Sequence, residues 1–415
     1  MTERLRVLVV DHTAELAGGE VALARLLAQL DATRFDVRVL LLAEGPLAER
    51  LRVLGIPVAV VAASDRLTGA GREDVVSSPL RLIGSAARTI ALVPRLMRAI
   101  RSAHADLVVA NTLKAAVLVS LAAPATGRRW VWHLHDRIAP DYLPRPLVAA
   151  MRVIARIGPR IIVANSEATR ATLPGVPKHR IVVAYPGIDM VAGAATTAEP
   201  LADHGRPPLL GLLGRIAPTK GQVEFLEAAA RIAAAHQDVR FVIIGDALFN
   251  DAPFAEGVRG MPAALGIAER VEFTGWLENP ATTVSALTAL VHASPVPEPF
   301  GQVLVEAMRI GTPVIGTDAG GVPEILEDPR GGGGGERVAG VRKTPLGLLV
   351  RPGDVNALSS AMNWMLEHPV ERASMAEAAR RSARERFDIR LSAHRVADAW
   401  ARAARRSAPP EQADG

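Results

Sequence analysis

The sequence predicts an α/β protein of two doubly wound, Rossmann-like domains, each built on a parallel sheet, that face a central cleft. The chain has 415 residues, which is enough for two hydrophobic cores and unusually large for one. In both halves, short apolar segments alternate with helix-like segments, as they do when helices cover both faces of a parallel sheet. A stretch rich in Ala, Thr and Pro at 191–208 separates the two series and indicates a linker.

The first series predicts an N-terminal domain over 1–190. Its expected strands lie at 6–10, 36–42, 58–62, 106–110, 130–135 and 160–164, and its first expected helices at 21–30 and 47–54. The second series predicts a C-terminal domain over 209–386. Its expected strands lie at 209–213, 241–244, 271–273, 290–292 and 314–316, and its first helix at 222–235.

Three further segments have their own predictions. The segment 387–406 is expected to be a helix, and the last residues, 407–415, to be a disordered tail. The run of glycines at 331–335 predicts a flexible surface loop.

Composition limits the class of protein. A hydrophobic content of 49% excludes a wholly disordered chain, and no apolar run reaches the roughly 20 residues that span a bilayer. The first apolar run ends at Asp11, which is too soon for a secretory signal. The absence of cysteine removes disulfides and thiolate chemistry. Together these features predict a cytoplasmic protein.

Charge is distributed unevenly along the chain. The isoelectric point is about 10.1, but the formal net charge is only +5, because few groups titrate between neutrality and the lysine range. Residues 1–189 hold 25 Lys and Arg against 16 Asp and Glu, so the first half carries the basic excess. Aromatic residues make up 4%, and no basic run alternates with stacking residues, so nucleic acid is not expected as a partner.

The most informative segment runs from Glu298 to Glu306. It places two carboxylates eight positions apart around a Pro-Phe-Gly turn, the first on an expected loop and the second on a helix that Gly301 opens. A polar junction of this kind at the end of a parallel sheet is where open α/β proteins bind ligands. For Glu306 alone, a solvated carboxylate at a helix start is the simpler explanation.

Glycine-containing turns strengthen this interpretation. The turn 214–221 carries Arg215 and Lys220 ahead of an expected helix, where cationic groups and the helix N-terminus favour an anion such as phosphate. Gly18-Gly19 and Gly320-Gly321 each follow an expected strand in the same way. Each turn alone is a weak signal, because Gly-Gly pairs also form simple bends.

Together these motifs resemble those of the retaining family 4 glycosyltransferases, which have the two-domain GT-B fold. The resemblance extends from about residue 5 to residue 387. It rests on Gly18-Gly19, Gly-Arg and Lys-Gly within 214–221, Glu-Pro-Phe-Gly at 298–301, Glu-Ala-Met at 306–308 and Gly-Gly-Val-Pro-Glu at 320–324. Weaker similarities lie at 132–136, 165–167 and 186–189, where this chain has Pro186 and the family usually has Asn.

The resemblance implies a nucleotide-diphosphate sugar, UDP- or GDP-linked, as the donor. Arg215 and Lys220 would neutralise the diphosphate as it leaves, and backbone N–H groups of Gly18 and Gly19 would complete the anion site from the other domain. The remaining implied donor contacts are Glu298 and the backbone of Phe300, Gly301 and Gln302 for the sugar, Glu306 for the ribose, and Trp276-Leu277 for the base.

His135 is the implied catalytic histidine, together with Arg215, Lys220 and Glu298, although a structural histidine at a strand end is the alternative. His133, two residues earlier, is expected on the other face of the strand in a structural role. No Asp-x-Asp motif occurs, so neither a metal nor any other cofactor is expected. In the family, retention is thought to follow front-face attack, in which a departing phosphate oxygen deprotonates the acceptor.

The acceptor is expected to be a glycan or a lipid-linked molecule of polysaccharide biosynthesis. The segment 77–104 carries arginines spaced by seven, Arg81, Arg88 and Arg95, although Pro94 is expected to kink or interrupt it. The segment 145–160 repeats the pattern with Arg152 and Arg156. Basic amphipathic helices bind anionic lipid, so the inner face of the membrane is a candidate partner. Ordinary sheet-covering helices with solvated arginines are the alternative.

Other functions stay open from the sequence. The acceptor could be a small-molecule natural product. A nucleotide-sugar epimerase or a phosphorylase on a similar fold is a second alternative, and a phosphorylase would need a pyridoxal-phosphate lysine, for which only Lys220 lies in a recognisable anion motif. A basic membrane-surface binding protein with vestigial catalytic motifs is the alternative from another class.

Overall fold

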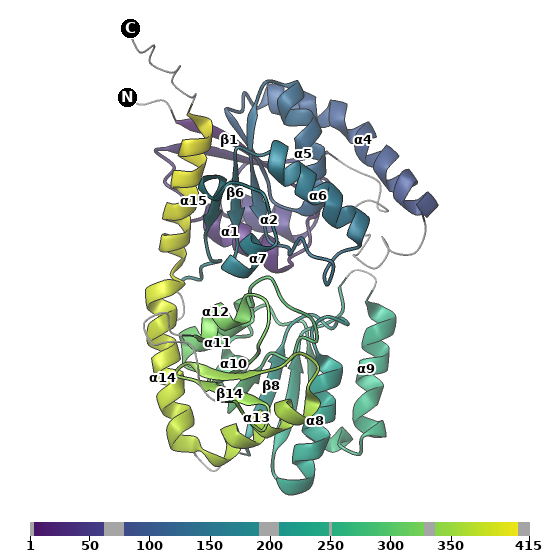
Figure 1. Cartoon of the computed structure of the whole chain (residues 1–415), viewed down its shortest axis with the longest axis vertical. Coiled ribbons are helices and arrows are strands. Elements are labelled where there is room, and N and C mark those ends of the chain that lie inside the picture. Colours follow the sequence, from purple (N-terminus) through teal and green to yellow (C-terminus); the bar gives the residue numbers. More distant parts are fainter. Residues whose placement is uncertain (1–3, 62–78, 191–206, 249–250, 328–336, 406–415) are drawn as a thin grey trace.

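The computed structural model describes residues 4–61, 79–190, 207–248, 251–327 and 337–405, with residues 79–90 described as backbone alone. It contains two α/β domains stacked along the long axis, each with one central sheet between helices (Figure 1). This is the doubly wound, two-domain architecture that the sequence predicts. Most of the expected linker, the glycine run at 331–335 and the tail at 407–415 lie outside the described residues.

The first sheet has seven parallel strands in the order β3-β2-β1-β4-β5-β6-β7. Its strands are β1 (Leu5–Asp11), β2 (Phe35–Leu41), β3 (Val58–Val60), β4 (Leu107–Ala110), β5 (Arg129–Leu134), β6 (Ile161–Ala164) and β7 (Ile181–Val183). Its helices are α1 (Gly18–Leu27), α2 (Pro46–Val53), α4 (Pro79–Ser102), α5 (Leu113–Ala125), α6 (Arg145–Ile157), α7 (Glu167–Ala171) and the 3-10 turn η2 (Lys178–Arg180). The strand order reverses between β1 and β4, which opens a crevice at the carboxyl ends of the strands.

The second sheet has eight strands in the order β10-β9-β8-β11-β12-β15-β14-β13. Its strands are β8 (Leu209–Leu213), β9 (Arg240–Ile244), β10 (Val271–Gly275), β11 (Ala289–Val291), β12 (Val314–Thr317), β13 (Arg337–Val338), β14 (Val341–Thr344) and β15 (Gly347–Val350). Around it lie α8 (Gln222–Ala235), α9 (Ala252–Ala264), η3 (Ala268–Arg270), α10 (Ala281–Ser285), α11 (Gln302–Ile310), α12 (Val322–Leu326), α13 (Val355–Glu367), α14 (Pro369–Arg386) and α15 (Ile389–Ala404).

Four local expectations differ from the structure. The second sheet is not parallel throughout, because β14 pairs antiparallel with β15 and with β13. The short edge strand β7 was not predicted. Helix α1 begins at Gly18 rather than at 21, since the glycines form its first turn. Helix α4 continues through Pro94, so the predicted interruption is wrong.

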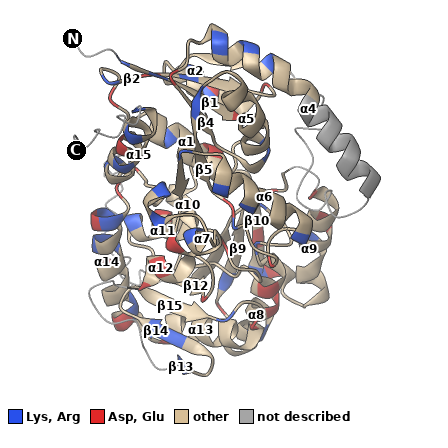
Figure 2. Cartoon of the chain, turned by 45° about the horizontal axis from the view of Figure 1, so that its top comes forward, with Lys and Arg blue, Asp and Glu red and all other residues tan. Residues whose placement is uncertain are grey.

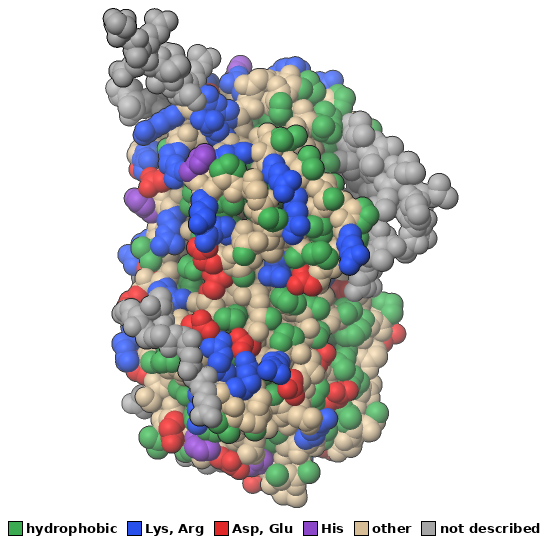
Figure 3. Space-filling model, viewed as in Figure 1, with side chains coloured by type: hydrophobic (Ala, Val, Ile, Leu, Met, Phe, Trp, Pro, Cys, Tyr) green, Lys and Arg blue, Asp and Glu red, His purple; other side chains and the backbone are tan. Residues whose placement is uncertain are grey.

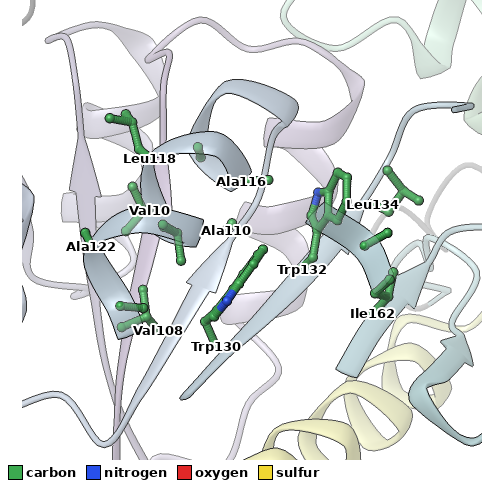
Figure 4. Close-up of a cluster of buried hydrophobic side chains, with 14 of the residues drawn as sticks. Val10, Val108, Ala110, Ala116, Leu118, Ala122, Trp130, Trp132, Leu134 and Ile162 are labelled. Atoms are coloured by element: carbon green, nitrogen blue, oxygen red, sulfur yellow. The ribbon is translucent and has the colours of Figure 1, made fainter. Parts of the chain in front are cut away.

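The central strands of the first domain, β1, β4, β5 and β6, are buried on both faces, so their sequences are nearly continuous apolar runs. Alternate residues point to opposite faces. On one face, Trp130 and Trp132 of β5 pack with Val108 and Ala110 of β4 and with α5 (Figure 4). On the other face, Val131 joins the core formed with α1, α2 and α15.

Helix α15 belongs to the core of the first domain although it ends the chain. It follows α14, which packs on the second domain, and then runs along the first domain, where Figure 1 shows it in yellow. Its Trp400 is fully buried, lies edge-on to Phe35 at 5.9 Å and stacks on His133 at 5.6 Å between ring centroids. The end of the chain therefore ties the two domains together.

Candidate active site

A cleft of about 1660 Å³ lies between the two sheets. It is lined by the loops that follow β1, β4 and β5 in the first domain and β8 and β11 in the second, all at the carboxyl ends of parallel strands. Every predicted site residue lines it: Gly18, Gly19, His135, Arg215, Lys220, Leu277, Glu298, Phe300, Gly301, Gln302 and Glu306. The structure therefore brings these residues together, while their individual roles remain predictions.

The loop with Arg215 and Lys220 is braced on both sides. Gly221 adopts a left-handed conformation, with a φ of 81°, and starts α8, so the first turn of that helix opens onto the loop. The side chain of Gln222 donates through Nε2 to the carbonyl of Arg215, at 2.8 Å. Arg215 in turn donates to Asp251 across 2.7 Å. The result is a positively charged helix entrance that suits a phosphate group.

Glu298 is held between two basic groups. Its side chain is 12% exposed, forms an ion pair with Lys220, and lies with Oε2 3.3 Å from Nε2 of His292. Burial by itself raises the pKa of this carboxyl, but the Lys220 ammonium and His292 together hold it well below its usual value. Glu298 is therefore an ionised acceptor in the cleft, able to hold sugar hydroxyls.

The backbone around Glu298 is fixed by the Gly320-Gly321 turn. Gly320 is left-handed, with a φ of 64°, and a Cβ there would overlap the main chain of Glu298. The Gly321 N–H donates to the carbonyl of Glu298 at 2.9 Å. Gly320 and Gly321, which resemble a ligand-binding turn in the sequence, thus pack against the loop that carries Glu298 and fix its backbone.

Gly18 and Gly19 form the first turn of α1 on the opposite wall. Helix geometry leaves the first N–H groups without intrahelical partners, so they can donate to an anion. The carbonyl of Gly18 accepts a hydrogen bond from Nε2 of Gln302 in the other domain, at 2.9 Å. A Cβ at Gly19 would lie 3.5 Å from the ring of His135, so this turn also places the histidine.

His135 is oriented by two polar residues that the sequence analysis did not single out. Asn111 donates through Nδ2 to the buried carboxylate of Asp11, at 2.8 Å, which fixes the orientation of its amide. Its Oδ1 therefore faces Nε2 of His135, at 3.0 Å, and accepts a hydrogen bond from the N–H at that position. Burial lowers the pKa of His135, so the ring is neutral near pH 7, with its proton on Nε2 and a lone pair on Nδ1.

A second carboxyl, that of Glu20, lies beside this chain of hydrogen bonds. Burial, the neighbouring Asp11 and, more weakly, Asp136 raise its pKa well above the usual range. Glu20 therefore holds a proton more readily than an ordinary glutamate does. The sequence feature that could have identified Asp11 and Asn111 is their position. Asp11 is the last residue of β1, and Asn111 directly follows β4.

Glu306 faces an arginine of the other domain. Nη2 of Arg25, on α1, lies 2.8 Å from its Oε1, and both side chains are about a quarter exposed, at 26% and 28%. Arg25 was not predicted as a site residue, because it is 281 positions away from Glu306 in the sequence. The ribose contact predicted for Glu306 would therefore form beside the guanidinium of Arg25.

Trp276 and Leu277, predicted near the base, also line the cleft. Trp276 is 53% exposed, which is unusual for so large an apolar side chain and leaves its ring open to a ligand.

Close to the cleft, Glu324 joins the two domains. Its carboxylate accepts hydrogen bonds from the backbone N–H groups of Glu167 at 2.8 Å and Ala168 at 2.6 Å, which begin α7. The hydroxyl of Tyr185 donates to it as well, at 3.0 Å. Ser166 adds a bond from its hydroxyl to the carbonyl of Pro299, at 2.6 Å. These contacts hold the loop of Glu298 against the first domain.

Within the described ranges, no group of three or more His, Cys, Asp and Glu side chains is arranged to hold a metal ion. None of the helices in that part of the chain is both long and apolar enough to cross a bilayer.

Comparison with known families gives the class of protein. The model described as Glycosyltransferase Family 4 matches residues 16–191, and the model described as Glycosyl transferases group 1 matches residues 196–382. The two matches fall on the two domains and between them cover most of the chain. The protein belongs to the family 4 glycosyltransferases and has their GT-B fold.

Individual relatives are more distant. The chain is 29% identical to the 2-deoxystreptamine glucosyltransferase of Streptomyces kanamyceticus, over 61% of this chain and 63% of that one. It is 27% identical to a GDP-mannose-dependent monoacylated alpha-(1-6)-phosphatidylinositol monomannoside mannosyltransferase of Corynebacterium glutamicum, over 52% of each chain. The matches thus span less than two thirds of these curated relatives.

A solved structure covers more of the molecule. The crystal structure of HepE from Anabaena in complex with UDP-glucose superposes with a TM-score of 0.77, at 26% identity, over 96% of this chain and 100% of that chain.

Proposed function

We propose that the protein is a retaining glycosyltransferase that moves a sugar from a UDP- or GDP-sugar to a glycan or lipid-linked acceptor. One observation carries this proposal. Arg215 and Lys220 lie at the entrance of α8 in the same cleft as the open first turn of α1 at Gly18-Gly19. Cations and helix ends of opposite domains suit a diphosphate between them. The bound UDP-glucose of the Anabaena structure supports the same donor class.

The carboxylates on the donor side favour a mechanism without a covalent glycosyl-enzyme. Asp251 is paired with Arg215, Glu298 with Lys220 and Glu306 with Arg25, so these three are committed to cations. In the proposed reaction, the acceptor oxygen bonds to the anomeric carbon while the bond to the diphosphate breaks. The acceptor proton passes to the departing phosphate oxygen. Arg215 and Lys220 then stabilise the charge of the leaving group.

The donor proposal is tested by thermal unfolding with UDP, GDP, ADP and UMP. A nucleotide at 100 times its Kd stabilises the protein by about 2.7 kcal/mol, so UDP or GDP should raise the Tm clearly above the others. Lys220→Ala should weaken diphosphate binding and turnover about tenfold or more, as expected for one charge-assisted contact. Lys178→Ala, an exposed lysine outside the cleft, is the matched control. If the Lys220→Ala and Lys178→Ala variants bound UDP or GDP equally well, the assignment of Lys220 to a phosphate site would be contradicted.

We also propose that catalysis needs no metal, because cationic side chains and helix ends already surround the leaving group. Sugar transfer should survive EDTA. Loss of activity in EDTA that Mg²⁺ or Mn²⁺ restores would contradict this.

An anionic membrane surface is the proposed site of action, and α6 provides the observation. Val153 and Ile157 of this helix are 51% and 80% exposed, and the same helix carries the exposed arginines Arg145 and Arg156. Figure 3 shows hydrophobic and basic side chains together over α6. Apolar side chains flanked by arginine suit the boundary between lipid headgroups and acyl chains.

Two of the arginines predicted to face lipid also form hydrogen bonds within the first domain. Arg152 donates to the carbonyls of Thr172 and Ile138, and Arg156 to that of Pro174, so both also brace a loop of the first domain. Basic residues follow the described part of α4 on the outside of the domain (Figure 2). The side chains of Arg81 and Arg88 lie outside the described residues.

A polar small-molecule acceptor is the second candidate. The observation in its favour is the similarity to the 2-deoxystreptamine glucosyltransferase, whose name gives 2-deoxystreptamine as the acceptor.

A further inference from the structure

The cleft continues from the donor site into an apolar groove of the first domain, called the α5–α6 groove below. Its walls come from α5 and from the segment that leads into and forms α6. The groove is lined by Leu113, Val117 and Leu121 on one side and by Leu143, Leu147 and Met151 on the other. Within each set the residues are four apart, and the three on α5 lie along a single face of that helix.

The groove begins next to the catalytic histidine. Asn111, which contacts His135, lies two residues before Leu113, the first residue of α5. Leu113 is therefore at the inner end of the three α5 residues that line the groove. Leu121 lies eight residues further along the helix, about 12 Å away at 1.5 Å per residue. It is 46% exposed, so the outer end of the groove opens to the surface.

Polar groups at the inner end of the groove have partners within the protein. Thr112 Oγ1 contacts Nδ1 of His12 at 2.8 Å and caps α5 through the N–H of Ala115 at 3.4 Å. The Tyr142 hydroxyl donates to Asp136 at 3.1 Å. Lys114 of α5 also lines the cleft and has a partner within the protein. The two leucine-rich rows themselves offer only aliphatic and thioether groups. A hydroxyl-rich molecule buried there would lose its hydrogen bonds to water without replacement.

We propose that the α5–α6 groove holds the apolar part of an amphiphilic acceptor, whose hydroxyl-bearing head lies beside His135. This rests on the proposed transferase function, because the groove is continuous with the donor site and starts at its histidine. It defines the class of acceptor as a hydroxylated head that carries an alkyl, acyl or prenyl chain. A fully polar sugar or cyclitol would leave the groove unused.

A series of glucosides tests the groove directly. Glucose and its hexyl, octyl and decyl β-glycosides, each below its critical micelle concentration, are titrated into the UDP-saturated protein by calorimetry. Affinity should increase with chain length, by up to about fourfold for each fully buried methylene. Glucose itself should bind too weakly to measure.

Two substitutions locate the effect. Leu121→Asp should weaken decyl glucoside binding at least tenfold and leave UDP affinity unchanged, since it places a charge in the path of the chain. Leu391→Asp is the matched control, because Leu391 on α15 is 44% exposed, close to the 46% of Leu121, and lies outside the cleft. It should leave both affinities unchanged.

The outcomes separate the two proposals. If UDP binds but glucoside affinity does not depend on chain length, the groove proposal is overturned and the transferase proposal stands. The same holds if the two variants bind decyl glucoside with equal affinity. Tighter binding of 2-deoxystreptamine than of decyl glucoside overturns the groove proposal as well. If UDP does not bind, the transferase proposal fails, and the groove is judged by the glucoside series on the protein alone.

Discussion

Asn111 lies between Asp11 and His135 and determines which ring nitrogen of the histidine carries the proton. Its amide cannot rotate without placing its oxygen against the Asp11 carboxylate, so the proton of His135 stays on Nε2. Glu20 lies beside this chain, and its burial together with the neighbouring Asp11 raises the pKa of the Glu20 carboxyl. A short polar chain thus prepares His135 to accept a hydrogen bond through Nδ1.

Asn111→Leu should lower turnover by about tenfold while UDP affinity stays unchanged, because it removes a hydrogen bond to the histidine at similar side-chain volume. Long-range proton–nitrogen NMR spectra of the wild type should show His135 as the Nε2–H tautomer, and the variant should lose this preference. Asn356→Leu, on the outer helix α13, is the control. A wild-type protein with the proton on Nδ1 would contradict the assignment.

At the scale of elements, α7 is a five-residue helix whose N-terminus is capped by a carboxylate of the other domain. Glu324 accepts from two of its first N–H groups, and Ser166 both caps the helix through Thr169 and bonds to Pro299. The interface therefore depends on where a very short helix begins. Burial, followed by the charge of Glu324, also raises the pKa of Tyr185 to about 12, so its hydroxyl remains a donor at this contact.

Glu324→Gln should reduce the free energy of unfolding by about 1–2 kcal/mol, because a neutral amide interacts less well with a helix N-terminus. Thermal and denaturant unfolding of the whole protein measure this change. Glu167→Gln removes a nearby exposed carboxylate that pairs only with Arg170 and should have a smaller effect. Equal effects of the two substitutions would mean that the interdomain cap contributes little.

Helix α6 makes the membrane proposal testable. The protein should co-sediment with anionic liposomes at low salt and dissociate as salt increases, because each basic residue near the surface contributes about 1 kcal/mol. Ile157→Asp should weaken this binding at least tenfold. Val370→Asp, at a site that is 78% exposed against 80% for Ile157, should not. Failure of the wild type to bind at low salt would leave a soluble acceptor as the better explanation.

At the scale of the whole molecule, the contact between His133 and Trp400 joins the C-terminal helix α15 to the first sheet. The indole Nε1 donates to Nε2 of His133 at 3.0 Å, and burial lowers the pKa of His133 to about 3. An unfolded histidine has a pKa of about 6.5. At a pH between these two values, the unfolded chain binds one proton more than the folded chain. The contribution of His133 to the free energy of unfolding is therefore complete above about pH 6.5 and decreases as the pH falls.

His133→Gln keeps an acceptor for Trp400 but cannot take up that proton. The wild type should therefore lose its advantage over the variant as the pH falls from 7 to 5, by up to about 1.4 kcal/mol per pH unit below 6.5. Denaturant unfolding of both proteins across this range gives the difference, in which the other titrating groups cancel. A difference that does not change with pH would show that His133 is not kept neutral.

The sequence alone predicted the fold class and the segments that meet at the cleft. The fold class follows from apolar segments that alternate with helices, and the turns with Arg215, Lys220 and Glu298 follow from polar residues after strands. His135 and Leu277 were predicted from the family resemblance. Most strands lie within one or two residues of their predicted positions. The strands β7, β13, β14 and β15 were missed because two to four residues carry too little periodicity.

Tertiary structure decided which polar groups meet. Arg25 reaches Glu306 over 281 positions, Asn111 reaches Asp11 over 100, and Glu324 reaches α7 over about 157. Each contact depends on strand order or on the way the domains pack, and neither is encoded in local spacing. The same holds for Arg152 and Arg156, whose helical spacing cannot reveal that loop carbonyls lie within reach. Local sequence fixes which elements form, while burial and charge in the assembled cleft determine what each side chain does.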